Sequence, residues 1–120
     1  MQLIAGALVV IVAALHLYFL VLEMFLWTTP FGRRTFGMTA DFAKSTRTLA
    51  ANQGLYNGFL AAGLLWGLVA YGIHSGRPVL TFFLACVVIA GIFGGVTVSR
   101  RIFLVQALPA IVAAGFVWLA

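Results

Sequence analysis

The chain has 120 residues, of which 64% are hydrophobic and only 8% charged, and its mean hydropathy is +1.16. A soluble domain of this length buries about two thirds of its surface and covers the rest with polar groups. This composition excludes such a domain. In a soluble protein the formal charge of +5 would indicate a nucleic-acid partner, but here the basic residues lie between long apolar segments. We therefore expect a protein solvated by a lipid bilayer, with no nucleic-acid partner.

Four apolar segments have the length of membrane spans. They run over about 3–27, 49–73, 79–98 and 102–119. Each is near the roughly 20 residues that a hydrocarbon core of about 30 Å requires. Strand-like alternation is absent, so helices are expected to satisfy the backbone. Turn residues separate the spans, among them Pro30, Gly76, Pro78 and Ser99. The prediction is one all-α domain over 1–120, a four-helix transmembrane bundle.

The loop charges predict the orientation of this bundle. Arg77 is the one basic residue on the side that holds both chain ends. The opposite side carries Arg33, Arg34, Lys44, Arg47, Arg100 and Arg101. By the positive-inside rule the basic side is cytoplasmic, which puts the N- and C-termini outside. The first span has no basic leader segment and no small-residue cleavage site, so it is expected to be retained. We expect a multi-pass protein of a bacterial plasma or inner membrane.

The first cytoplasmic loop, residues 28–48, is long for so small a bundle. Thr28, Thr29 and Pro30 are expected to end the first helix. The second half of the loop predicts a capped start of the second helix, with Thr39 as N-cap and Asp41 in the first turn. That helix is expected to protrude into the cytoplasm. The loop as a whole fits either a solvated segment that contacts lipid headgroups or a lid over a site.

Polar residues within the spans gather at the predicted cytoplasmic leaflet. They are Glu23, Asn52, Gln53, Tyr56, Asn57 and Gln106. His16 precedes Glu23 by two turns, so it lies roughly 10 Å deeper on nearly the same face. On the second helix, i, i+4 spacing pairs Asn52 with Tyr56 and Gln53 with Asn57. Lipid cannot satisfy both pairs, so at least one is expected to face protein.

Each of these residues has a structural and a functional interpretation. The amides and the tyrosine are either interhelical hydrogen-bonding groups or ligand contacts. Glu23 is either an interfacial carboxylate paired with Arg100 or Arg101, or a group that contacts ligand or carries a proton. His16 is either a hydrogen-bonded core residue or part of a proton relay. His16, Glu23 and the single cysteine, Cys86, lie at different levels and predict no metal site.

Small residues at four-residue spacing predict close helix contacts in the second and third spans. The pairs are Gly54 with Gly58, Gly63 with Gly67, Ala90 with Gly94, and Gly91 with Gly95. This spacing supports compact packing or oligomerisation and does not identify a partner.

Three segments carry a resemblance to a known family. The runs 16–27, HLYFLVLEMFLW, and 49–62, LAANQGLYNGFLAA, with QALP at 106–109, are similar to the bacterial integral membrane family known as domain of unknown function number 1304. The similarity extends over essentially the whole chain. It implies four spans and brings no activity with it.

The cytoplasmic start of the second helix also resembles, more distantly, the MAPEG superfamily of eicosanoid and glutathione metabolism. The resemblance rests on Arg47, Ala51, Asn52 and Tyr56. It implies the same four-helix topology and a trimer, in which an Arg, an Asn and a Glu of helix two hold glutathione between subunits. Asn52 matches that Asn, Arg47 is displaced by one residue, and Leu55 occupies the Glu position.

Two classes of function follow, with a purely structural membrane subunit as the third. The first is a MAPEG-like binder or enzyme that takes glutathione or another small thiol from the cytoplasm and an apolar substrate from the bilayer. The second is a proton-coupled transporter that uses Glu23, similar to the small multidrug resistance family in size and in its carboxylate on helix one. The candidate ligand-binding residues are His16, Glu23, Arg47, Asn52, Gln53, Tyr56, Asn57, Arg100, Arg101 and Gln106.

Overall fold

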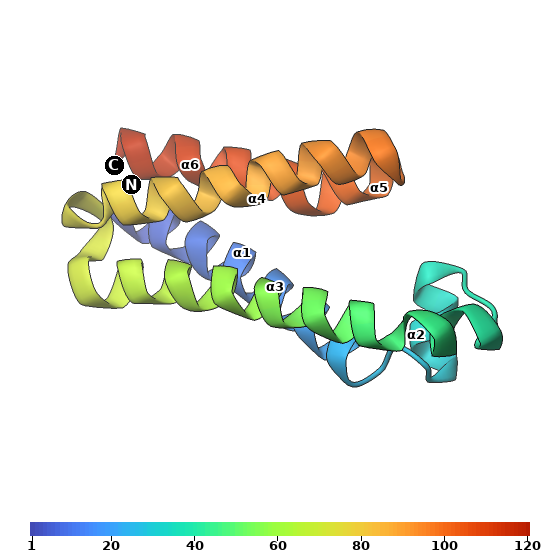
Figure 1. The fold of residues 1–120 in the computed structure, drawn as a ribbon. Helices are drawn as coiled ribbons and strands as arrows, with labels where there is room; N and C mark the ends of the chain where they lie inside the picture. Colours follow the sequence, from blue (N-terminus) through green and yellow to red (C-terminus); the bar gives the residue numbers. More distant parts are fainter. The chain divides into compact units, whose positions relative to one another are not determined.

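A computed structural model describes all 120 residues and contains helices without strands (Figure 1). The elements are α1 (Gln2–Met24), α2 (Pro30–Phe36), α3 (Ala40–Ser75), α4 (Arg77–Thr97), α5 (Arg100–Ile102), the π-helix η1 (Phe103–Ala107) and α6 (Leu108–Leu119). Four segments are long and apolar enough to cross a membrane, namely α1, α3, α4 and the continuous stretch Arg100–Leu119. The predicted all-α fold with four transmembrane helices is confirmed.

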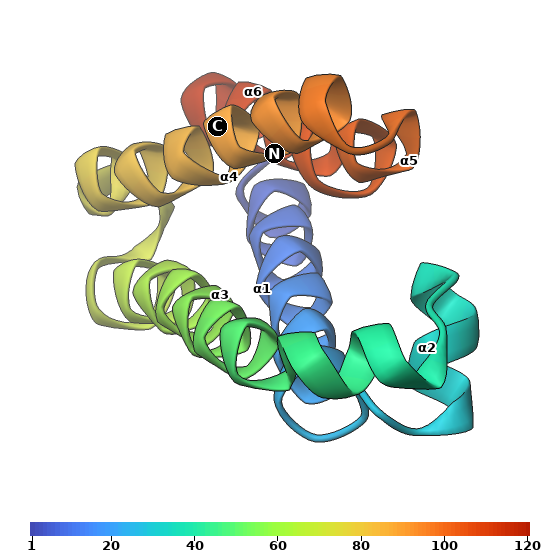
Figure 2. The ribbon, with the colours of Figure 1, turned by 45° about the vertical axis from the view of Figure 1, so that its right-hand side comes forward.

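The chain forms two compact units, and α1 and α3 each run from one into the other. The first unit comprises Met1–Ala14 with Leu60–Ala120, and the second comprises Leu15–Phe59. Figure 2 shows the same helices turned by 45°. All four spans contribute to the core of the first unit, where Val9, Leu64, Leu84 and Val117 are fully buried. The first unit is therefore a four-helix bundle in its own right.

Both chain ends lie at the same end of the first unit as the connection between α3 and α4. Gln2 and Leu3 line a groove together with Gly72 and Ile73, and the side chain of Arg77 donates hydrogen bonds to the carbonyls of Val117 and Ala120. An even number of spans requires this arrangement. Which end faces the outside stays a prediction from the loop charges.

Glycines let the helices of the first unit approach closely, as the small-residue spacing predicts. A Cβ atom added to Gly67 would lie 2.9 Å from a methyl carbon of Val79 on α4. A Cβ atom on Gly91 would lie 2.5 Å from the backbone nitrogen of Ala107 in η1. Real Cβ atoms do not approach other atoms so closely, so a larger side chain at Gly91 would force the two backbones apart.

The connection between α3 and α4 begins earlier than the predicted turn at Ser75 and Gly76. Gly72 has φ 78° and ψ −174°, a conformation that breaks the helix before its last residues. Glycine adopts it without steric cost because it has no Cβ atom. α4 then starts at Arg77, with Pro78 in its first turn, where the missing N–H is not needed.

The fourth span differs from a regular helix because it contains a wide turn. The backbone N–H of Leu108 bonds to the carbonyl of Phe103, five residues earlier, at the end of η1. Pro109 follows directly, and a proline ring clashes with the carbonyl four residues before it in a regular helix. The π-helical turn relieves that clash, and it places Gln106 in the irregular stretch.

The second unit contains a helix that the sequence analysis did not predict. Thr29 and Pro30 were expected to end the first helix, but they begin α2, where Thr29 Oγ1 accepts a hydrogen bond from the N–H of Gly32. α2 ends at Gly37, whose φ of 64° is left-handed. α1 has already ended at Met24, three residues before the predicted end of the span. The predicted loop over 28–48 is therefore largely helical.

The start of α3 is as predicted. The N–H of Phe42 donates to Oγ1 of Thr39, which caps the helix, and Asp41 lies in the first turn. α3 is 36 residues long. Even up to the break at Gly72 it spans roughly 50 Å, well beyond the hydrocarbon core of about 30 Å. Part of α3 must therefore extend out of the membrane.

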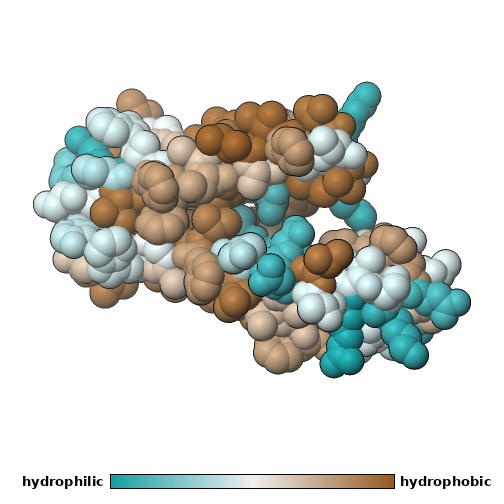
Figure 3. Space-filling model, viewed as in Figure 1, coloured by the Kyte–Doolittle hydropathy of each residue, from teal (hydrophilic) through white to brown (hydrophobic).

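The surfaces of the two units differ in hydropathy. Apolar side chains cover much of the exposed surface of α4, whereas hydrophilic ones gather around α2 and the start of α3 (Figure 3). Large apolar residues such as Phe82, Ile89 and Phe93 are more than half exposed on α4. In the first unit this surface is suited to contact with lipid tails.

Candidate functional site

The one polar pair that is buried between helices lies in the second unit, at the end of α1. Glu23 and Asn57 are each only 7% exposed. The side-chain amide of Asn57 donates a hydrogen bond of 2.5 Å to Oε1 of Glu23. The bond joins α1 to α3 across 34 residues of sequence. It satisfies two groups whose burial without a partner would be costly.

Two glycines on α3 bring Glu23 and Asn57 within reach. A Cβ atom on Gly54 would lie 2.7 Å from Cγ of Met24 and 3.1 Å from Cβ of Glu23. A Cβ atom on Gly58 would lie 2.7 Å from a methyl carbon of Leu20. The predicted close contact at this glycine pair is therefore made with α1. Because the backbones approach there, the short side chain of Asn57 reaches the carboxylate.

His16 lies on α1, seven residues before Glu23, and is 1% exposed. Its ring meets that of Phe19 edge-on, with 5.2 Å between the centroids. Seven residues correspond to about 10 Å along a helix and bring His16 to nearly the same face as Glu23. The buried polar residues of the chain are therefore these two on α1 and Asn57 on α3.

The other candidate residues of α3 lie on its exposed surface. Asn52 and Gln53 are exposed, and Tyr56 is 56% exposed. Of the two predicted pairs, only Asn57 packs inside the chain. Asn52 lies five residues before Asn57, which is about 140° around the helix. The polar residues of α3 therefore form a buried contact on one side and an outward-facing polar surface on the other.

Arg47 is also exposed, but it does not share the surface of Asn52. The two residues are five positions apart, so their side chains leave α3 about 140° from each other. A single chain therefore does not bring the guanidinium and the amide of the MAPEG-like pattern together.

The remaining candidates belong to the first unit. Arg100 and Arg101 are exposed at the start of the fourth span, and Gln106 is half-buried in η1. The structure brings Glu23 together with Asn57, and the expectation that the polar residues of the spans gather at the cytoplasmic leaflet stays a prediction.

Contacts that the sequence analysis did not predict hold the second unit together around Trp27. The indole Nε1 donates to Oγ1 of Thr46 over 3.0 Å, and the ring packs on Phe36 with 4.9 Å between centroids. The sequence signal for α2 was a tryptophan placed shortly after the end of α1 and directly before Thr28 and Thr29, because a buried indole N–H usually finds a hydrogen-bond partner.

Asn57 is the only hydrogen-bond donor to the Glu23 carboxylate, so the second oxygen can accept a bond from a ligand or carry a proton.

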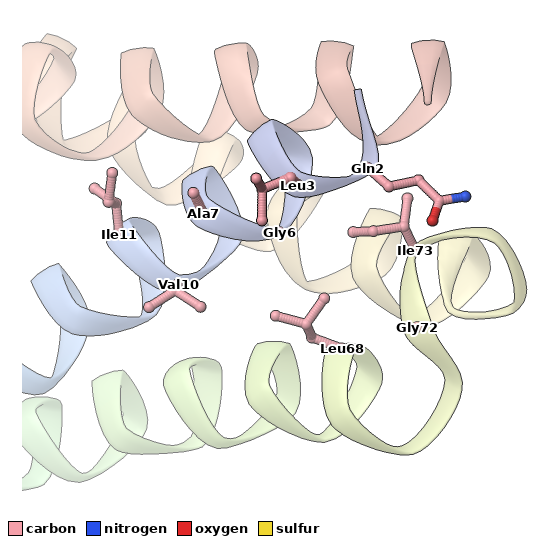
Figure 4. Close-up of a pocket in the computed structure, with 9 residues that line it drawn as sticks. All are labelled: Gln2, Leu3, Gly6, Ala7, Val10, Ile11, Leu68, Gly72 and Ile73. Atoms are coloured by element: carbon pink, nitrogen blue, oxygen red, sulfur yellow. The ribbon is translucent and has the colours of Figure 1, made fainter.

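The first unit has no comparable polar group in its surface groove between α1 and α3. That groove is lined by apolar residues over 3–11 and 68–73, with Gln2 as its one polar side chain (Figure 4). The second unit is therefore better suited than this groove to bind a polar ligand.

The fold and this pair define a small all-helical, multi-pass membrane protein with a buried carboxylate–amide pair between two of its helices. The family model "Protein of unknown function (DUF1304)" matches residues 10–118. The chain belongs to that family, as the resemblance indicated. It is similar to a Lactococcus lactis subsp. lactis protein named "Uncharacterized protein YpaA", with 28% identity over 105 residues that cover 86% of this chain and 87% of the other. No solved structure matches the chain.

Proposed function

We propose that this protein binds a small polar cosubstrate, glutathione or another small thiol, at the cytoplasmic leaflet and an apolar substrate from the bilayer. The observation that carries the proposal is the outward-facing polar surface of α3. Asn52, Gln53 and Tyr56 are exposed there, beside the buried Asn57. Lipid tails offer no hydrogen-bond partners to such groups, so another copy of the chain, water or a bound ligand must provide them.

A site between copies of the chain fits this geometry better than a site within one chain. Arg47 and Asn52 leave α3 in directions about 140° apart. When copies pack side by side, Arg47 of one copy can approach Asn52 of the next. A homotrimer, as the MAPEG resemblance implies, would form three such sites. The bacterial plasma membrane, with the termini outside, is the location we propose.

Each group in this site would have a distinct role. Arg47 would hold the anionic group of the cosubstrate through charge-assisted hydrogen bonds. Tyr56 and Asn52 would orient the sulfur and stabilise the thiolate, which is the reactive form. The hydrogen bond between Glu23 and Asn57 would fix the rotation of α3 on α1, so that Asn52 and Tyr56 stay turned outward.

The test is calorimetric titration of the detergent-solubilised protein with glutathione. Tyr56→Phe and Asn52→Leu should each weaken binding about tenfold or more, because each removes a hydrogen bond to a charged group. Tyr71→Phe is the matched control, since Tyr71 is an exposed tyrosine near the other end of α3. Native mass spectrometry should show a trimer. A monomer that binds no thiol would contradict the proposal and favour a structural subunit.

A proton-coupled transporter is the second candidate, because Glu23 is a buried carboxylate that accepts a hydrogen bond from Asn57 at one of its two oxygens. Substrate-driven flux in proteoliposomes under an imposed pH gradient distinguishes the two. Gradient-dependent flux that disappears in Glu23→Gln would establish transport, since glutamine cannot carry the proton. Under the binding proposal Glu23→Gln keeps the contact to Asn57, and no pH-driven flux is present in either protein.

A further inference from the structure

A second surface groove lies in the first unit, at the junction of α4 with the fourth span. It is lined by Ile92, Gly95 and Val96 of α4, by Phe103 and Leu104 of η1, and by Arg100. All of these groups are apolar except the guanidinium of Arg100. The groove thus combines an apolar trough with a single positive charge.

The shape of the groove follows from Gly95. A Cβ atom there would lie 2.7 Å from Cβ of Phe103, so α4 and η1 are in close contact at this point. The larger side chains on either side remain turned outward, with Val96 82% and Leu104 56% exposed. The backbone at Gly95 therefore forms the bottom of the groove, and the branched side chains of Val96 and Leu104 form its sides.

The groove lies at the end of α4, where a span of this length would reach the membrane interface. α4 ends at Thr97, and Ile92 lies five residues before that end, which is about 7.5 Å along the helix. Arg100 lies beyond the end of α4. A molecule in the groove would therefore place a charged group at the level of Arg100 and an apolar chain beside Ile92, within the hydrocarbon.

No acidic side chain of the first unit can neutralise Arg100. The chain contains only two acidic residues, Glu23 and Asp41, and both belong to the second unit. Arg101 adds a second positive charge next to Arg100. On the cytoplasmic side of a bacterial membrane, anionic lipids carry the opposite charge to Arg100.

We propose that this groove binds one anionic phospholipid of the cytoplasmic leaflet. Its phosphate would accept hydrogen bonds from the guanidinium of Arg100, which matches phosphate geometry through paired N–H donors. One acyl chain would lie along Ile92, Val96 and Leu104. This function is separate from thiol binding and leaves Arg47 to the cosubstrate.

The test is native mass spectrometry of the detergent-solubilised protein titrated with palmitoyl-oleoyl phosphatidylglycerol or with the matching phosphatidylcholine. The wild type should bind the first phosphatidylglycerol about tenfold more tightly than phosphatidylcholine. Arg100→Gln should remove most of this preference. Arg101→Gln is the matched control, because Arg101 does not line the groove, and it should cost at most the roughly fivefold effect of one basic residue near a charged membrane surface.

A second pair of variants tests the apolar part without changing charge. Val96→Trp fills the groove from an exposed position and should weaken phosphatidylglycerol binding severalfold. Ile89→Trp places the same side chain at another exposed position of α4, outside the groove, and should leave binding unchanged. Equal losses in Arg100→Gln and Arg101→Gln, no effect of Val96→Trp, or displacement of the lipid by inorganic phosphate would each overturn the proposal.

Discussion

In the first unit the buried contacts between helices are made by glycine and apolar side chains, whereas in the second unit a buried polar pair also joins two helices. Gly67 and Gly91 lie directly against the neighbouring helices of the first unit. In the second unit a hydrogen bond joins Glu23 to Asn57, and another joins Trp27 to Thr46. The two units therefore differ in whether polar side chains take part in their buried helix contacts.

This difference has a physical basis in the surroundings of each unit. Between apolar helices in lipid the hydrophobic effect contributes little, so association depends on close packing, which small residues permit. Where helices extend toward water, polar groups can remain solvated until they find a partner. The second unit is accordingly the part in which polar side chains are available for binding, and substitutions should affect the two units through different mechanisms.

The largest effect is expected from Gly91→Leu in the first unit. Its Cβ atom would lie within 3 Å of the backbone of Ala107, which cannot move aside as a flexible side chain can. Overpacking against backbone should destabilise the protein by about 3 kcal/mol or more. The measurement is thermal unfolding in mild detergent, followed by size-exclusion chromatography of the heated samples.

Gly115→Leu is the control, because a Cβ atom at Gly115 meets nothing within 4 Å. It should change the free energy of unfolding by no more than about 0.5 kcal/mol. If the two leucine variants unfolded at the same temperature, α4 and η1 would not approach as closely as the structure shows.

Most of the fold could be predicted from the sequence, because hydropathy alone identifies spans of this length. The N-cap at Thr39 and the close contacts of Gly54, Gly63 and Gly91 were also predictable, since capping and small-residue spacing are local patterns. The helix α2 was missed because Thr29 and Pro30 serve equally well to stop one helix and to start another. Only the packing of Trp27 on Phe36 shows that Thr29 and Pro30 begin a helix here.

The candidate site was predictable in its residue types but not in its pairings. Helical spacing places the polar residues of α3 in pairs, yet it does not say which direction faces a neighbour: Gln53 is exposed although its predicted partner Asn57 is buried. Asn57, and not Gln53, reaches Glu23 because Gly54 and Gly58 set the contact between α1 and α3. That contact joins residues distant in sequence and depends on the packing of the whole helix pair.

An intermediate effect is expected from Asn57→Leu in the second unit. The substitution removes the amide that donates to Glu23 and leaves the carboxylate buried without its donor. Loss of this bond should destabilise the protein by about 1–2 kcal/mol, measured by the same thermal unfolding.

Asn52→Leu is the matched control for this change, because Asn52 is exposed on the same helix. It should leave stability unchanged or slightly raised, since it removes a polar group from a surface within reach of lipid. Equal destabilisation by the two substitutions would mean that Asn52 is also a packing residue, and Asn52 would then be withdrawn from the proposed thiol site.

The smallest effect is expected from Arg77→Gln, which tests one of the polar contacts between α4 and α6 in the first unit; the other is the hydrogen bond that Trp118 Nε1 donates to Oγ1 of Thr81 over 2.9 Å. Arg77 Nε donates to the carbonyl of Val117 over 3.1 Å, and its guanidinium lies 5.4 Å from the ring centroid of Trp118. A cation at this position donates hydrogen bonds to carbonyls that the last turn of α6 leaves without intrahelical partners. Its positive charge also interacts favourably with the negative end of the helix dipole. Because Arg77 is only half-buried, its loss should cost about 0.5–1 kcal/mol.

Arg34→Gln, at an exposed position of α2, is the control and should have no effect on unfolding in detergent. A loss in Arg77→Gln as large as that in Asn57→Leu would show that the first unit depends on polar contacts as much as the second, and the distinction between the two units would fail.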